Sequence, residues 1–329
     1  MFKINKIIFI IYIIIIIITS CAKSTEPVSS EDILKIDMFY STIGYARDIF
    51  VSDSLLYIAE DQGGFSIYNH ATNTQYCRFT EFENARLISA VEEDSILFVY
   101  DRYGEFAGLR VFDISDLTVP QEDMLVTGRN IEAIKTYKND NGTIEILATF
   151  ENEYGYGEYN GTYWYTFFYR YFPNYLVGFD IDSCYIYIAG EQLGLYIVDR
   201  TATALNILSI TDTPGEALDV KLVNNYVFIA DKQEGFSIID ISNKENPEII
   251  FQQDTSGWAQ SIDVEGNYLV IGSGGGGVYL YDISDIQNPT FIDRIDDSII
   301  GYTYRVKIWN CKIFAATKKG VYKLSFEIE

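Results

Sequence analysis

Short runs of β-branched and aromatic residues, separated by turn-forming residues, recur along most of the chain. The clearest set covers residues 215–222, 226–230, 235–242 and 247–251. Runs of this length between clusters of Asn, Asp, Gly and Pro predict four consecutive antiparallel strands. The next stretch, residues 257–292, repeats the same order. A four-stranded unit that recurs about every 42 residues is typical of a β-propeller blade.

A glycine at the start of the third run of each unit measures the repeat. It occurs six times, at Gly64, Gly108, Gly194, Gly235, Gly277 and Gly320. The successive spacings are 44, 86, 41, 42 and 43 residues, and 86 is twice 43, so one more unit is expected between Gly108 and Gly194. Residues 33–329 therefore predict an all-β, seven-bladed propeller of four-stranded antiparallel blades.

The unit between Gly108 and Gly194 departs from the common pattern. Residues 131–137 and 143–150 predict a first hairpin. The Asn-Gly pair at 160–161 predicts a second hairpin, between 154–159 and 163–169. Many residues of this second hairpin are aromatic, and most of the rings are expected to lie in the core between blades. An exposed aromatic patch is the alternative.

The two ends of the propeller sequence complement each other. The last unit, residues 301–326, contains only three predicted strands. Residues 33–38 stand before Ile43-Gly44-Tyr45 as residues 291–295 stand before Ile300-Gly301-Tyr302. The N-terminal strand is therefore expected to be the fourth strand of the last blade. Such closure removes exposed sheet edges, which otherwise pair with other chains.

Residues 1–20 have a different character from the repeats. Two lysines precede an unbroken apolar run at 7–18, and Thr19 and Ser20 precede Cys21. A basic start, an apolar run and a small-residue cleavage site describe a secretory signal peptide, and the run is shorter than the roughly 20 residues of a membrane-spanning helix.

Ile-Thr-Ser-Cys at positions 18–21 resembles the bacterial lipobox, in which the cysteine is lipidated and becomes the new N-terminus. An ordinary signal peptide that ends beside a cysteine is the alternative. Residues 21–32 contain Ser, Thr, Glu and one Pro without periodicity, which predicts a flexible tether. We expect an exported protein that is held by this lipid in the outer membrane or at the cell surface.

Composition narrows the classes of partner. The formal net charge is −23, and removal of residues 1–20 with their two lysines makes it −25. So acidic a domain is not expected to bind nucleic acid or anionic lipid headgroups. We interpret the negative charge as that of a solvated surface, on which repulsion between molecules keeps the protein soluble. Cation binding is the alternative. Apolar residues make up 48% of the chain, which is ample for a core.

The residues that usually carry catalysis or hold metals are sparse. His70 is the only histidine, so neither a Ser-His-Asp arrangement nor a histidine metal site is supported. Cys77, Cys184 and Cys311 show no C-x-x-C spacing, and we expect buried thiols, with one disulfide as the alternative. No metal or cofactor is predicted.

One run identifies a family resemblance. Residues 194–199 read Gly-Leu-Tyr-Ile-Val-Asp, which is close to the Leu-Val-Ile-Val-Asp core of the LVIVD-repeat family. Residues 185–189, 226–230 and 56–59 resemble the second strand of that family. The resemblance covers five units well, the second unit fairly and the third poorly. It implies a propeller on the outside of bacterial and archaeal cells, mostly without known activity.

Topology indicates where a binding site would lie. In such a blade, the loop that enters the first strand and the loop between the second and third strands emerge on one face. Aromatic residues in variable loops on a rigid scaffold are typical of a binding face. The candidates from these loops and from the irregular third unit are Tyr45, Tyr175, Trp258, Tyr302, Asp61, Asp231, Tyr154 and Tyr156.

Tyr45, Trp258 and Tyr302 occupy equivalent positions in consecutive units. They either form one stacking surface for a sugar or an extended peptide, or cover the seams between blades. We predict a monomeric propeller that serves as a binding or scaffold module for a glycan or an envelope protein. The alternative is a surface-exposed glycan hydrolase or lyase that uses paired carboxylates, which a tight pocket with two carboxylates would favour.

The lipobox predicts how the protein is anchored. Replacement Cys21→Ser should move the protein from the membrane fraction to the soluble fraction and abolish incorporation of labelled palmitate, because the acylated sulfur is lost. The control Cys77→Ser should remain labelled and membrane-bound. Label that persists in Cys21→Ser would show that the lipoprotein interpretation is wrong.

Overall fold

The computed structural model describes residues 32–105, 107–127, 130–159, 164–202 and 204–327. The predicted signal peptide, Cys21 and all but the last residue of the predicted tether lie outside the described residues. Within the described residues, no helix is both long and apolar enough to cross a membrane.

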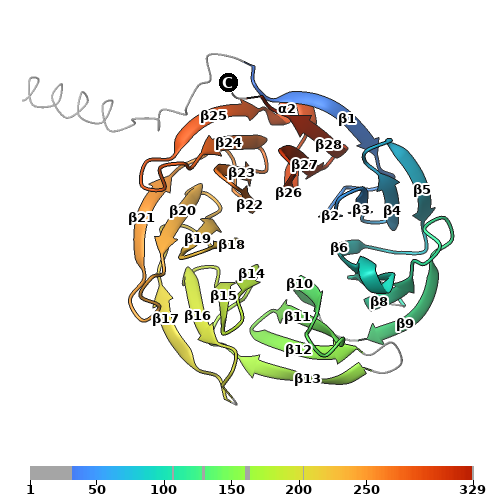
Figure 1. The fold of residues 1–329 in the computed structure, drawn as a ribbon, viewed down its shortest axis with the longest axis horizontal. Helices are drawn as coiled ribbons and strands as arrows, with labels where there is room; N and C mark the ends of the chain where they lie inside the picture. Colours follow the sequence, from blue (N-terminus) through green and yellow to red (C-terminus); the bar gives the residue numbers. More distant parts are fainter. Residues whose placement is uncertain (1–31, 106, 128–129, 160–163, 203, 328–329) are drawn as a thin grey trace, which may run out of the picture.

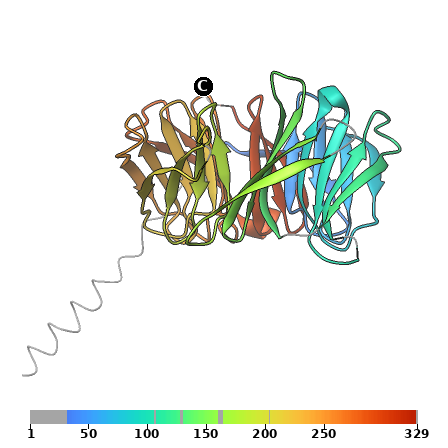
Figure 2. The same ribbon diagram turned by 90° about the horizontal axis from the view of Figure 1, so that it is seen from below.

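The described part of the chain forms seven four-stranded antiparallel sheets, arranged as blades in a ring (Figure 1). Figure 2 shows the ring from the side, with the strands running between its two faces. Blades one to three comprise β2 (Asp48–Val51), β3 (Leu55–Ala59), β4 (Phe65–Asn69) and β5 (Thr74–Phe79); β6 (Ala85–Val91), β7 (Ile96–Asp101), β8 (Gly108–Asp113) and β9 (Gln121–Thr127); and β10 (Ile131–Lys138), β11 (Ile144–Phe150), β12 (Glu153–Tyr159) and β13 (Trp164–Tyr171).

Blades four to seven follow the same order, apart from the closing strand. They comprise β14 (Phe179–Ile181), β15 (Tyr185–Ala189), β16 (Leu195–Asp199) and β17 (Ile207–Thr211); β18 (Asp219–Val223), β19 (Tyr226–Ala230), β20 (Phe236–Asp240) and β21 (Glu248–Gln253); β22 (Ser261–Glu265), β23 (Tyr268–Gly272), β24 (Val278–Asp282) and β25 (Thr290–Ile295); and β26 (Thr303–Trp309), β27 (Lys312–Thr317), β28 (Gly320–Ser325) and β1 (Lys35–Ser41). Two short helical turns, η1 (Glu92–Asp94) and α2 (Asp297–Ile300), complete the elements of the residues that the structure describes.

The core consists of layers between neighbouring blades. The second strand of a blade is buried on both sides, which explains why its sequence is continuously apolar rather than alternating. Between blades one and two, the ring of Phe65 lies 5.4 Å from Phe79, 5.8 Å from Phe82 and 5.0 Å from Phe112, centroid to centroid. Burial of apolar area at roughly 25 cal/mol per Å² makes such layers the main source of stability.

Blade three confirms the unit that the glycine spacing predicted. Strands β10 and β11 form the first hairpin, and β12 pairs with β13 to form the second. Tyr154 keeps only 7% of its surface exposed, and its ring lies 6.0 Å from that of Phe179 in blade four. Tyr159 is also buried and packs against Phe98 of blade two. These two rings belong to the core, as expected, whereas Tyr171 of the same blade is exposed.

The ring closes as predicted. Strand β1 pairs antiparallel with β28, so the seventh blade combines both ends of the propeller. The strand begins at Lys35 and ends at Ser41, somewhat later than the expected 33–38. The residues just before it are held differently, because the backbone nitrogens of Ile33 and Leu34 donate to Asp293 Oδ2 of blade six at 2.8 and 2.7 Å.

The turns explain why glycine and aspartate recur at fixed places in the repeat. Gly64 has φ of 78°, and a Cβ atom there would lie 1.9 Å from the carbonyl oxygen of Phe79, so only glycine fits. At the end of the third strands, Asp240 Oδ1 accepts from the nitrogen of Ser242 at 2.8 Å, and Asp282 Oδ1 from that of Ser284 at 2.7 Å. These aspartates cap their own turns.

The cysteines correct one expectation. Cys77, Cys184 and Cys311 are free thiols, and Cys184 and Cys311 are exposed rather than buried. Both lie in tight turns near strand ends, where burial between blades is not available.

Closure by β1 predicts the effect of a truncation. Removal of residues 1–41 should leave the edge of β28 unpaired and abolish cooperative unfolding or cause aggregation, because an open edge pairs with other chains. Chemical denaturation and light scattering would measure this against a control that begins at residue 32. A truncated protein that stays soluble and unfolds at the same denaturant concentration as the control, with the same cooperativity, would contradict the closure mechanism.

Candidate functional site

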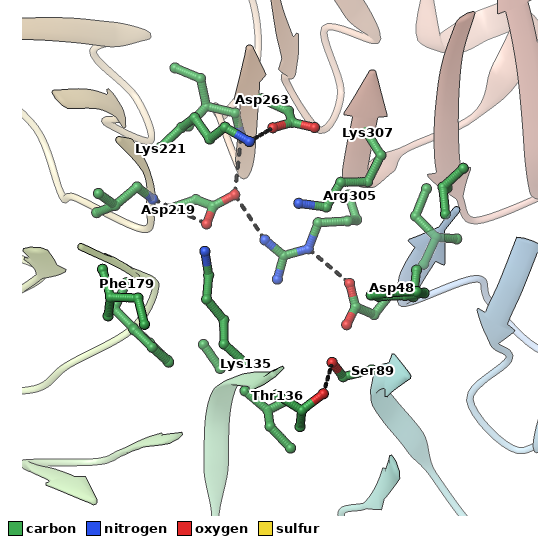
Figure 3. A pocket seen from close by; sticks show the side chains of 18 of the residues that line it. Asp48, Ser89, Lys135, Thr136, Phe179, Asp219, Lys221, Asp263, Arg305 and Lys307 are labelled. Atoms are coloured by element: carbon green, nitrogen blue, oxygen red, sulfur yellow. Dashed lines mark hydrogen bonds and ion pairs between the residues drawn. The ribbon is translucent and has the colours of Figure 1, made fainter. Parts of the chain in front are cut away.

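The innermost strands, one from each of the seven blades, lie around the axis of the ring (Figure 1). They surround a central cavity of about 700 Å³, which Figure 3 shows from close by. Alternate residues of a strand point to one side of the sheet, so each innermost strand presents every second side chain to the axis. Charged residues occupy many of these positions: Asp48, Lys135, Lys221, Asp219, Asp263, Arg305 and Lys307.

Arg305 on β26 is the hub of this cavity. Its Nε donates to Asp48 Oδ1 of blade one at 3.0 Å, and its Nη1 donates to Asp219 Oδ2 of blade five at 2.8 Å (Figure 3). Burial alone lowers the pKa of Arg305, but Asp219 and Asp48 raise it well above its ordinary value. The guanidinium therefore stays charged and ties three blades together across the axis.

The carboxylates in the cavity also bind backbone N–H groups of the next blade. Asp48 Oδ2 accepts from Ile88, and Asp219 Oδ2 from Ile262, each at 3.1 Å. Two further contacts of this kind are Leu222 N to Asp180 Oδ2 at 2.9 Å and Ile308 N to Asp263 Oδ2 at 3.1 Å. An innermost strand has a free edge at the axis, so these carboxylates satisfy N–H groups that no strand reaches.

Lysines pair with two further carboxylates of the innermost strands. Lys135 Nζ lies 2.5 Å from Asp180 Oδ1, and Lys221 Nζ lies 2.6 Å from Asp263 Oδ1. Burial raises the pKa of Asp263, but Lys307 and Lys221 more than offset this, and the net pKa lies below the ordinary value. At Asp48 burial prevails over Arg305, and its pKa is raised.

This arrangement limits the chemistry of the cavity. A carboxyl that acts as acid, base or nucleophile must have an oxygen directed at the substrate. Both oxygens of Asp48 and of Asp219 are already bound by Arg305 or by backbone N–H groups. The carboxylates therefore hold the ring together.

The two acidic candidates from the loops are buried. Asp231 is fully buried and accepts from Thr213 Oγ1 at 2.7 Å and from the nitrogen of Gly215 at 3.1 Å, and burial raises its pKa. Asp61 is also buried and holds Arg47 by an ion pair of 2.7 Å. Both carboxylates are buried beneath the loops of the predicted binding face and hold these loops through the contacts just described.

Three tyrosines meet on that face, and we call Tyr45, Tyr302 and Tyr304 the tyrosine patch. The ring of Tyr304 lies 5.0 Å from that of Tyr302 and 6.3 Å from that of Tyr45. Arg47 extends over two of them, with its Cζ 4.4 Å from the Tyr304 centroid and 5.0 Å from that of Tyr45. The structure therefore joins Tyr45 and Tyr302 through Tyr304, which the sequence analysis did not single out.

The other aromatic candidates lie apart from the patch. Trp258 is 51% exposed, and Lys232 Nζ lies 5.3 Å from its ring centroid. Tyr175 Oη donates to Glu132 Oε1 at 2.6 Å, and burial raises its pKa. Tyr154 lies in the core, and Tyr156 lines a second cavity of about 530 Å³ between blades three and four.

Comparison with known proteins agrees with this architecture. The LVIVD repeat model matches residues 43–67, 214–255 and 256–297, which lie in blades one, five and six. The chain therefore carries LVIVD repeats, although residues 194–199, which identified the resemblance in the sequence, lie outside the matched ranges. No curated protein matches the chain.

Among solved structures, the chain is similar to the computationally designed Ika8 protein. The TM-score is 0.63 at 13% sequence identity, over 87% of this chain and 98% of that one. At this identity the likeness concerns the fold alone. The chain folds as a seven-bladed β-propeller, and its blades one, five and six carry LVIVD repeats.

Arg305 provides a test of the charge network. Replacement Arg305→Met should destabilise the fold by about 3–5 kcal/mol, because two buried carboxylates lose their cation. Since protonation of Asp48 is favoured in the folded state, this deficit should shrink as pH falls from 7 to 5. Urea denaturation at both pH values measures it.

The control Lys312→Met removes a more exposed ion pair with Asp37, of 3.0 Å, and should cost less than about 1 kcal/mol at either pH. Equal losses in the two variants, or a deficit of Arg305→Met that grows at pH 5, would contradict the role of Arg305.

Proposed function

We propose that this protein is a lipid-anchored module of the cell envelope that binds a glycan or a protein partner on the face of the tyrosine patch. The observation that carries the proposal is the patch itself: three half-buried tyrosines from the ring-closing seam, with Arg47 laid over two of them. Aromatic rings with one apolar face and a polar group suit sugar rings and extended peptides.

The support beneath the patch is rigid, which favours binding. The loop between the second and third strands of a blade bridges to the start of the next blade, as Gly274 does to Thr303 and Asp61 to Ala85. A Cβ atom on Gly274 would lie 2.8 Å from the ring of Tyr302, so the tyrosine lies directly on this loop. A surface fixed in this way loses little conformational entropy when a ligand binds.

The location follows from the predicted export signal. Residues 1–20 and Cys21 support export and lipid anchoring in the outer membrane or at the cell surface, and residues 21–32 would separate the ring from the membrane. The net charge of −23 disfavours contact of the ring with anionic headgroups or nucleic acid.

The hydrolase or lyase alternative has less support. It needs a pair of carboxylates directed at a substrate, about 5–10 Å apart. The carboxylates of the central cavity are bound to Arg305, to lysines and to backbone N–H groups. We therefore favour binding over catalysis as the role of this propeller.

The double variant Trp258→Ala with Tyr302→Ala tests the proposal. Its retention on an array of neutral and acidic oligosaccharides and on immobilised envelope extract should fall about tenfold, since each aromatic contact is worth about 0.5–1.5 kcal/mol beyond burial. The melting temperature should change by only a few degrees, because Trp258 is exposed and Tyr302 only half-buried.

A matched control is Tyr171→Ala, which removes an exposed ring from β13, outside the loops of this face. It should leave retention unchanged. A large fall in melting temperature of the double variant would identify these rings as seam packing, and unchanged retention would contradict the binding face.

A further inference from the structure

On the face of the tyrosine patch, several innermost strands begin with a residue outside the ladder register. The register shifts between Ala85 and Leu87 in β6, between Ile131 and Ala133 in β10, and between Thr303 and Arg305 in β26. The residues at these shifts are Arg86, Glu132 and Tyr304. β-Bulges re-aim side chains and are frequent beside functional sites.

Two arginines near these bulges have acidic partners. Arg47 precedes β2 and pairs with Asp61 at 2.7 Å. Arg102 follows β7 and lies 3.7 Å from Glu132 Oε1, which also accepts from Tyr175. Asp61 and Glu132 are therefore already engaged by other cations and donors.

Arg86 differs from its neighbours. Its side chain is half-buried, yet no residue of the described part of the chain forms a hydrogen bond or an ion pair with it. Burial lowers the pKa of Arg86, the nearby charges of Arg47 and Arg102 lower it further, and Asp61 and Glu132 offset only part of this. A partly buried cation between two like charges is unfavourable in the absence of an anion.

The guanidinium geometry indicates which anion would fit. Arginine presents a rigid, planar set of donors that matches a carboxylate in bidentate fashion. Three arginines here face the two carboxylates of Asp61 and Glu132, so this group keeps one excess positive charge in a chain of net charge −23. It also adjoins the tyrosine patch, because Arg47 lies over both Tyr45 and Tyr304.

We propose that Arg86, flanked by Arg47 and Arg102, binds the carboxylate of an acidic glycan whose sugar rings stack on the tyrosine patch. The inference rests on the proposed function and names the chemical class of its ligand. A uronic acid carries its carboxylate on the ring that stacks, so one sugar unit satisfies both features. An acidic peptide side chain supplies the carboxylate without a ring for the patch.

The experiment uses the mature, detergent-solubilised protein and titration calorimetry. The probes are tetragalacturonate, its neutral methyl ester and a hexaglutamate peptide. Tetragalacturonate should bind at least tenfold more tightly than the ester. Arg86→Gln should abolish this preference without weakening ester binding, and Arg86→Lys should restore only part of it, because an ammonium lacks the bidentate geometry.

A matched control is Lys244→Gln, which removes one positive charge from the loop between β20 and β21, on the opposite face. It should keep the full preference for the acid. Arg86→Gln should melt at or above the temperature of the unaltered protein, because it removes an unpaired charge. A purely structural arginine would instead lower the melting temperature when replaced.

Equal affinity for the acid and the ester, or a preference that survives in Arg86→Gln, would overturn the inference. If Tyr302→Ala still weakens both saccharides in that case, the proposed binding face stands and only the role of Arg86 fails. If Tyr302→Ala weakens neither saccharide, the binding face fails as well. Arg86-dependent binding of hexaglutamate alone would overturn the glycan and identify an acidic peptide as the ligand.

Discussion

A propeller must satisfy the free edges of its innermost strands, and in this chain buried carboxylates do so. Asp48, Asp219 and Asp263 each accept a backbone N–H group from the following blade, so neighbouring blades are connected at the axis as well as through apolar layers. Arg305 then neutralises two of these carboxylates from different directions. Strand β1 pairs with β28 at the outer rim, so both ends of the propeller sequence are held within one blade and the ring is closed.

The sequence was sufficient for the architecture because the repeat has a local physical cause. A glycine such as Gly64 is required wherever the backbone takes a positive φ against a neighbouring carbonyl, so its spacing counts the blades, including the irregular third one. The short last unit likewise predicted the closing strand. The axial network follows no such rule, since Arg305 and its two partners are 257 and 86 positions apart.

Loop position was a weaker guide to the site than to the fold. Asp61 and Asp231 were expected on the binding face, but each is buried beneath its loop, where it holds Arg47 or the entry to the first strand. Tyr304 was missed because a bulge, which the repeat spacing does not reveal, brings it between Tyr302 and Tyr45. Local pattern identifies a loop, whereas the direction of its side chains depends on the neighbouring blade.

Charged side chains are paired differently at the axis of the ring and on the face of the tyrosine patch. At the axis, Arg305 is matched by two carboxylates, and further lysines are paired with Asp180 and Asp263. On the face of the tyrosine patch, Arg86 has no hydrogen bond or ion pair with any residue that the structure describes, whereas its neighbours Arg47 and Arg102 are paired with Asp61 and Glu132. Natural sequences tolerate an uncompensated group where function requires it, provided that the surrounding structure is rigid enough to hold it. The closed ring provides that rigidity, and the missing charge is the one that an acidic ligand would supply.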